Sequence, residues 1–233
     1  MAYNNHAASP GLHVAADLLA IAFFFLICPG KYCASTVDLH LFCFSNVEFW
    51  QGSTKLSLQL APRASFLSAT HLVLTFTTQK NSVRGEQVAQ CPLGHTLLCP
   101  ICALARRILH LCQHGAPPAS PLHAYYPQSG IAPIQCSAQS ISMLLRRTVT
   151  LLHPDLNPRN YAASNLCATG ATALLLTGVD FNLIRLLGCW QSDAMLCYLH
   201  VQAAPVRHHL ATHMLHAAPG PVTTLPIRNV PLL

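Results

Sequence analysis

The chain has 233 residues, of which 52% are apolar and only 9% are charged. This apolar content is enough for one large domain with a buried core, whereas the charged fraction is far below the roughly 25% of an average soluble domain. The net charge is +6, from 13 basic and 7 acidic residues. This balance favours a polyanionic partner such as DNA.

The sequence does not fit two other common classes of protein. Eleven cysteines are scattered through a chain too large to depend on disulfides, and their number is odd, so a secreted disulfide framework is disfavoured. The apolar run at 18–28 is about half the length of roughly 20 residues that crosses a bilayer. Neither Lys nor Arg precedes Lys31, so the run does not resemble a signal peptide. We therefore expect a buried helix here and no membrane association.

The first half of the chain is predicted to hold a helix followed by a small sheet. Residues 1–11 are expected to be a disordered tail, and 12–28 to be a helix that Pro29 stops. Alternating or β-branched segments predict strands. These segments are 37–44, part of 47–58, 71–78 and 83–90, and the last two are joined by a turn at 79–82.

The second half is predicted to be almost entirely helical. Pro100 suits a first helical turn, Gly178 suits a helix C-terminus, and Asp180 suits a helix cap. The fold class is therefore α+β, mostly helical, with a small antiparallel sheet. The predicted helices are 100–113, 137–152, 162–176, 181–187, a segment that starts at Ser192 or Asp193 and contains Tyr198, and 206–216, with a loop at 115–133.

Several residues could carry chemistry, although each has an ordinary structural explanation. Tyr198 lies in an apolar helical segment, where tyrosine is usually part of the core, and Lys80 lies near a predicted hairpin tip, where lysine is usually solvated. The basic pairs 106–107 and 146–147 could contact phosphates. Pairs of this kind most often form a solvated helix face.

Five segments, in chain order, carry a resemblance to a known family. The most specific is 184–200, which reads IRLLGCWQSDAMLCYLH. The others are 77–86, 99–104, 170–175 and 178–180. Together they resemble the phage-integrase-like tyrosine recombinases of eukaryotic mobile elements, of the Crypton or tyrosine-recombinase retroelement type. The resemblance runs from about 17 to 216 and implies the tyrosine recombinase catalytic-domain fold.

The resemblance implies a particular reaction. In this family a tyrosine hydroxyl attacks a DNA phosphodiester and forms a 3′-phosphotyrosine, which is covalent catalysis without a metal or nucleotide cofactor. Two arginines clamp the phosphate, a hairpin lysine protonates the leaving 5′-oxygen, and a His or Trp orients the phosphate. DNA recombination and DNA integration in the nucleus, with DNA and a synaptic tetramer of the chain as partners, are therefore expected.

Three positions match the family's site residues and three depart from them. Tyr198 matches the nucleophile, Lys80 the hairpin lysine and Trp190 the His/Trp position. The departures fall at the charge clamp, where Cys28 and Cys167 replace the two arginines and Ser164 replaces their basic partner. The arginines expected to contact DNA are Arg84, Arg106, Arg107, Arg146, Arg147 and Arg185.

The three departures predict impaired catalysis. Removing one preorganised charge-stabilising donor typically lowers the rate by about 100- to 1000-fold, and a thiol cannot replace the charged fork of a guanidinium. We expect strand cleavage to be weak or absent, so an inactive DNA-binding pseudoenzyme is the main alternative. Since single C-to-T changes convert CGN arginine codons into cysteine codons, we hypothesise decay at methylated CpG sites. The hypothesis requires TGY codons at these cysteines.

The domain organisation follows from the resemblance. Residues 12–218 would be the catalytic domain and 219–233 an extended tail, without the family's N-terminal core-binding domain. A less favoured alternative is a zinc-binding module, because four potential ligands have zinc-like spacing. These residues are Cys91, His95, Cys99 and Cys102.

Overall fold

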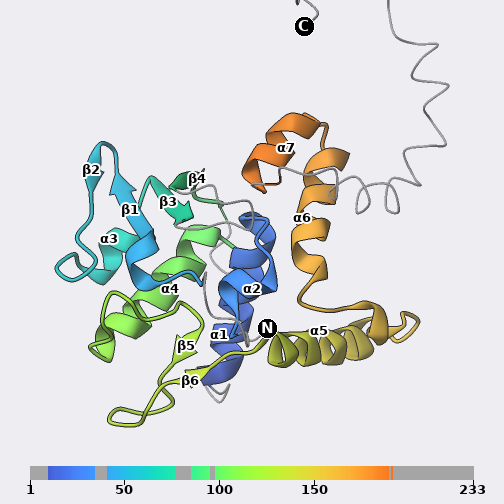
Figure 1. The fold of residues 1–233 in the computed structure, drawn as a ribbon, viewed down its shortest axis with the longest axis horizontal. Helices are drawn as coiled ribbons and strands as arrows, with labels where there is room; N and C mark the ends of the chain where they lie inside the picture. Colours follow the sequence, from blue (N-terminus) through green and yellow to red (C-terminus); the bar gives the residue numbers. More distant parts are fainter. Residues whose placement is uncertain (1–9, 35–40, 77–84, 95–97, 189, 191–233) are drawn as a thin grey trace, which may run out of the picture.

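The computed structural model describes residues 10–34, 41–76, 85–94, 98–188 and 190. The helix α1 (Pro10–Phe24) lies at the centre, between the sheet with α4 (Pro100–Gln113) on one side and α5 to α7 on the other (Figure 1). The fold class is α+β with a small antiparallel sheet, as predicted.

The N-terminal helix differs from its prediction at both ends. It begins at Pro10, so the predicted disordered tail 1–11 is too long by two residues. It ends at Phe24 instead of residue 28, because the backbone of Leu26 turns into the left-handed region with φ 51°. Pro29 then opens the short helix α2 (Pro29–Tyr32), a position where proline is well tolerated.

The four-stranded sheet has the order β2-β1-β3-β4, and its paired strands are antiparallel. This confirms the strands predicted within 47–58, at 71–78 and at 83–90, in the parts of these segments that the structure describes. The observed strands are β1 (Val47–Gln51), β2 (Thr54–Lys55), β3 (His71–Phe76) and β4 (Glu86–Gln90).

The strand predicted at 37–44 is wrong in the part that the structure describes. Leu41 and Phe42 lie outside any strand, and Phe44 opens the 3-10 helix η1 (Phe44–Asn46). The Cys43 N–H donates to Oδ1 of Asn46 at 2.7 Å. This side-chain bond favours a tight turn over an extended strand.

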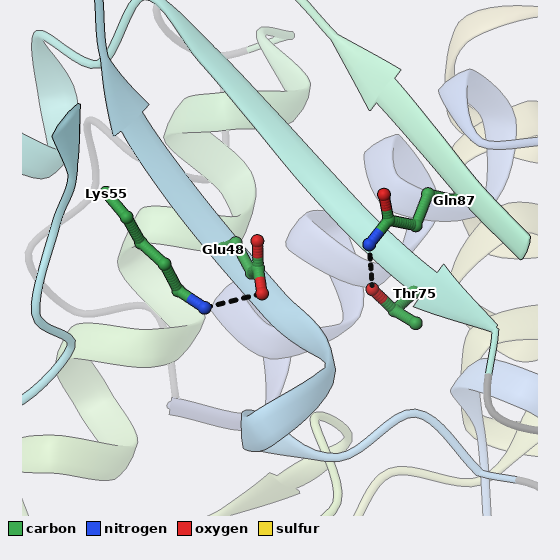
Figure 2. A network of polar contacts seen from close by, with 4 residues as sticks. All are labelled: Glu48, Lys55, Thr75 and Gln87. Atoms are coloured by element: carbon green, nitrogen blue, oxygen red, sulfur yellow. Dashed lines mark hydrogen bonds and ion pairs between the residues drawn. The ribbon is translucent and has the colours of Figure 1, made fainter. Parts of the chain in front are cut away.

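One face of the sheet is buried and the other is polar. Leu72, Leu74 and Phe76 of β3 point into the core. On the opposite face the amide of Gln87 donates to Thr75 at 3.4 Å, and Lys55 pairs with Glu48 at 2.5 Å (Figure 2). Burial alternates along β3, as expected for a sheet that is covered on one face.

The central helices pack around this buried face. The helix α4 has its predicted bounds, and the short helix α3 (Arg63–Leu67) packs near it. The helix α5 (Ala138–Leu152) begins as predicted, because Ser137 Oγ accepts the N–H of Ser140 at 3.1 Å. Inside the predicted loop 115–133 lies β5 (Ala124–Tyr125), which pairs with β6 (Ile134–Gln135), a small hairpin that was not predicted.

The last described helices also follow their capping signals. The helix α6 (Asn165–Leu176) begins three residues later than predicted, after the 3-10 helix η2 (Pro158–Asn160). Gly178 has φ 82°, and the Asp180 carboxylate accepts two N–H groups at the start of α7 (Phe181–Leu187). Within the described ranges, no helix combines the length and apolar character needed to cross a bilayer.

Candidate functional site

The two cysteines at the predicted clamp positions lie in contact with each other. The sulfur atoms of Cys28 and Cys167 are 3.8 Å apart, although 139 positions separate them in the sequence. Cys28 lies in the turn between α1 and α2 and is exposed, whereas Cys167 lies in the first turn of α6 and is buried. One exposed thiol and one buried thiol therefore form a pair at the end of α1.

A close approach of α1 and α6 positions this pair. A Cβ placed on Gly170 would lie 2.4 Å from the backbone oxygen of Phe23, so only glycine fits at this crossing. One turn before Gly170, the same approach leaves Cys167 facing the end of α1. Gly170 belongs to one of the segments that carry the family resemblance.

Tyr32 provides a second connection at this place. It is 1% exposed, and its hydroxyl donates to the carbonyl oxygen of Ala163 at 3.0 Å. Burial raises the pKa of Tyr32 far above its ordinary value, and the neighbouring thiols of Cys33, Cys167 and Cys28 add to this. The side chain therefore stays neutral and acts here as a hydrogen-bond donor that holds α2 against the segment before α6.

The buried thiol of the pair, Cys167, is neutral at physiological pH. The hydrogen bond with Cys28 and then burial raise the pKa of Cys167 well above its ordinary value. The sulfur of Cys167 also lies 3.6 Å from the carbonyl oxygen of Ser164, with which a protonated thiol can interact as a weak donor. Neither thiol can supply the positive charge that the resemblance implies for these positions.

Ser164 and Trp190 lie next to the same site. Ser164 is exposed and its hydroxyl donates to Oδ1 of Asn165 at 3.2 Å. Trp190 is half-buried and packs against a small apolar cluster that includes Leu26, two residues before Cys28. The fold thus brings Cys28, Cys167 and Ser164 together, and Trp190 lies in an apolar cluster with Leu26, which precedes Cys28 by two residues.

The other predicted site residues lie outside the part of the chain that the structure describes. These are the proposed nucleophile Tyr198, the hairpin Lys80 and the DNA contact Arg84.

The arginines predicted to contact DNA divide into two groups. Arg107 is 2% exposed and donates to the carbonyl oxygens of Leu122 and Ala124, so its prediction as a DNA contact is wrong. Arg106 forms an ion pair with Asp17, with 2.7 Å between Nη2 and Oδ1. Three are exposed and remain candidates: Arg146, Arg147 and Arg185.

A separate cavity of about 520 Å³ lies near the other end of α1. Arg63, Arg106 and His13 line it, together with His110 and Tyr126. Burial lowers the pKa of His110 to about 4, with help from the positive charges of Arg107 and His114. The N–H of Tyr126 donates to Nε2 of His110 at 2.9 Å, which requires the neutral ring.

The alternative zinc ligands are only partly described. His95 lies outside the described residues, and Cys91 is exposed on the segment after β4. Cys99 and Cys102 share a hydrogen bond at the start of α4, where burial of Cys99 raises its pKa and nearby N–H donors lower it, with a net decrease. Among the described residues, no three potential ligands come close enough to hold a metal ion.

The chain was compared with protein-family models and with curated proteins. No protein-family model matches the chain. No curated protein matches it either. These comparisons therefore assign no family to the chain.

Two residues of the site carried no chemical signal in the sequence. Tyr32 looks like any core tyrosine, and Leu26 gives no indication of a left-handed backbone, since such a conformation is usual for glycine and rare for leucine. The Pro29-Gly30 dipeptide was the available signal, because it marks a sharp change of chain direction.

Proposed function

We propose that this chain is a DNA-binding protein derived from a tyrosine recombinase of a mobile element, with strand cleavage impaired by loss of its charge clamp. The contact between Cys28 and Cys167 carries the proposal. The resemblance assigned these two positions to arginines that grip one phosphate. Such arginines must be neighbours in space, and the two positions are neighbours here despite their distance in the sequence.

The surroundings of the pair also support the proposal. In this reading Trp190 follows α7 and would face the same phosphate, and Ser164 stands near the position of the basic partner. Tyr198 would follow eight residues after Trp190, as the nucleophile, and Lys80 would act as the general acid. The reaction would need no metal or nucleotide cofactor.

The chemistry of the pair argues for impairment. A phosphoryl-transfer transition state carries added negative charge on its non-bridging oxygens, and a cysteine side chain cannot supply a compensating positive charge. Arginine presents five N–H donors in a planar fork, whereas a thiol is a single weak donor. Loss of both arginines would lower the rate by roughly 10,000-fold or more, if each contributes about 100-fold.

DNA binding would depend on the remaining exposed arginines. Arg146 and Arg147 are consecutive residues of α5, Arg159 lies in η2, which packs against α5, and all three side chains are exposed. Phosphate contacts supply most of non-specific affinity, and each one contributes to its salt dependence. We propose moderate affinity without strong sequence preference for the chain as it stands.

A capture experiment tests the proposal. The full chain is incubated with a library of nicked random-sequence duplexes, which trap covalent intermediates, beside a variant with Cys28→Arg, Ser164→His and Cys167→Arg. We expect an adduct only in the substituted variant, and none when Tyr198→Phe is added to it. Circular dichroism and a gel shift verify that each variant folds and binds DNA.

The remaining outcomes distinguish the alternatives. The folded triple variant could bind DNA without forming an adduct. This result would contradict recombinase ancestry of the site and would favour a DNA-binding protein of another kind. Absence of any gel shift at low salt would contradict DNA binding itself. One equivalent of bound zinc in the purified chain would instead favour the zinc module around Cys91, His95, Cys99 and Cys102.

A further inference from the structure

We propose that Cys28 and Cys167 form an oxidisable dithiol, which a low-molecular-weight disulfide such as oxidised glutathione converts into a bridge between the α1–α2 turn and α6. The proposal stands apart from recombinase function, because it concerns the thiols that are present and not the arginines they would replace. It rests on the position, exposure and surroundings of the two sulfur atoms.

The geometry brings the two sulfur atoms close to bonding distance. They are 3.8 Å apart, and a disulfide bond is about 2.05 Å long. Since Cys28 is exposed in a turn, rotation of its side chain can close the gap without displacing a helix. Among the described cysteines, all nine are thiols rather than disulfides.

Unequal exposure gives the two thiols different parts in the reaction. Cys28 can be reached by a soluble oxidant, whereas Cys167 is 4% exposed. The Cys28 thiolate would attack one sulfur of oxidised glutathione, forming a mixed disulfide and releasing one glutathione thiolate. This step also removes the hydrogen bond to Cys28, the largest of the influences that raise the pKa of Cys167.

The second step closes the bridge. Cys167 loses its proton to solvent, and its thiolate attacks the sulfur of Cys28, which expels the second glutathione. Two protein thiols are thereby oxidised by two electrons, and one glutathione disulfide is reduced to two thiols. Because the bridge would join positions 139 apart, it constrains much of the unfolded chain and should stabilise the fold.

The test uses the full chain with oxidised glutathione at neutral pH, followed by blocking of unreacted thiols and peptide mapping. We expect a cross-linked peptide pair containing Cys28 and Cys167, reversed by dithiothreitol, together with a rise in Tm of roughly 5 °C or more. Cys28→Ser should abolish both effects. Cys167→Ala should instead trap one glutathione on Cys28, because the residue that resolves the mixed disulfide is missing.

A built-in comparison makes the experiment decisive. Cys99 and Cys102 form a second close pair, but Cys99 is only 1% exposed. Mapping a bridge to this pair and not to Cys28 would overturn the proposal. Stable glutathione on Cys28 of the unmodified chain, without a bridge, would overturn it as well. Should Cys167→Ala fail to fold, Cys167→Ser provides the same trapping test.

Discussion

Gly170 determines how closely α1 and α6 can approach. Alanine normally stabilises a helix interior by up to about 1 kcal/mol relative to glycine. Here an added Cβ would lie 2.4 Å from the Phe23 backbone oxygen, which cannot move without shifting α1. We predict that Gly170→Ala lowers the free energy of unfolding by about 2 kcal/mol, as overpacking typically does.

Urea denaturation measures this effect, and Gly30→Ala is the matched control. Nothing lies within 4 Å of a Cβ placed on Gly30, which is also helical. The control should leave stability unchanged or raise it slightly. Equal stability of Gly170→Ala and the unmodified chain would show that the two helices are farther apart than described.

Tyr32 acts through a single buried hydroxyl. We predict that Tyr32→Phe lowers the free energy of unfolding by about 1–2 kcal/mol, because the Ala163 carbonyl loses its donor in a dry environment. Tyr161→Phe is the control, since Tyr161 is half-exposed and its hydroxyl makes no hydrogen bond within the described residues. Thermal unfolding compares the two, and a similar loss in both would contradict the assigned bond.

At the scale of whole elements, capping residues in the sequence predicted helix starts reliably, because they act within one helix. Asp180 caps α7 as predicted, and Ser137, predicted as the first residue of a helix, caps α5, because a cap depends only on the next three residues. The prediction was wrong at the end of α1 and missed the β5–β6 hairpin. In those places the conformation depends on packing against distant residues, which the local sequence pattern does not predict.

The ion pair between α1 and α4 could not be predicted either, because it too depends on tertiary packing. Asp17 is 3% exposed and pairs with Arg106, which the sequence suggested as a DNA contact. We predict that Arg106→Met costs about 3 kcal/mol of stability, since the buried carboxylate loses its guanidinium. Adding Asp17→Leu should recover most of the loss, because a buried ion pair is often no better than an apolar pair.

A double-mutant cycle with urea denaturation measures this coupling. The exposed pair of Glu48 and Lys55 offers the contrast, because solvent screens it and such pairs contribute about 0–1 kcal/mol. Lys55→Met should therefore have little effect. If Arg106→Met lowered the free energy of unfolding as little as Lys55→Met, the ion pair between α1 and α4 would be screened by solvent to the same extent.

For the whole molecule, composition and sequence pattern predicted the α+β fold class, but they did not indicate that positions 28 and 167 meet. The contact of Cys28 with Cys167 is tertiary, and only the family resemblance connected the two positions beforehand. Charge alone was a poorer guide. Arg107 looked like its neighbours in sequence yet is buried, because the helical face that it occupies packs against the β5 segment.

His110 links the stability of the chain to pH. Burial, aided by Arg107 and His114, lowers the pKa of His110 from 6.5 to about 4. Between these values the unfolded chain binds a proton that the native chain excludes. Stability from this group is therefore complete above pH 6.5 and is lost as the pH falls towards 4.

We predict that the free energy of unfolding falls by about 1 kcal/mol between pH 7 and pH 5 because of His110. This loss is smaller than the full pKa shift would give, because solvent screens the half-exposed ring. Urea denaturation at both pH values measures it in the unmodified chain and in His110→Gln, which keeps an acceptor for the Tyr126 N–H. The variant should lose less stability on acidification. His153→Gln, which removes an exposed imidazole, is the matched control, and parallel curves for the chain and His110→Gln would contradict the assignment.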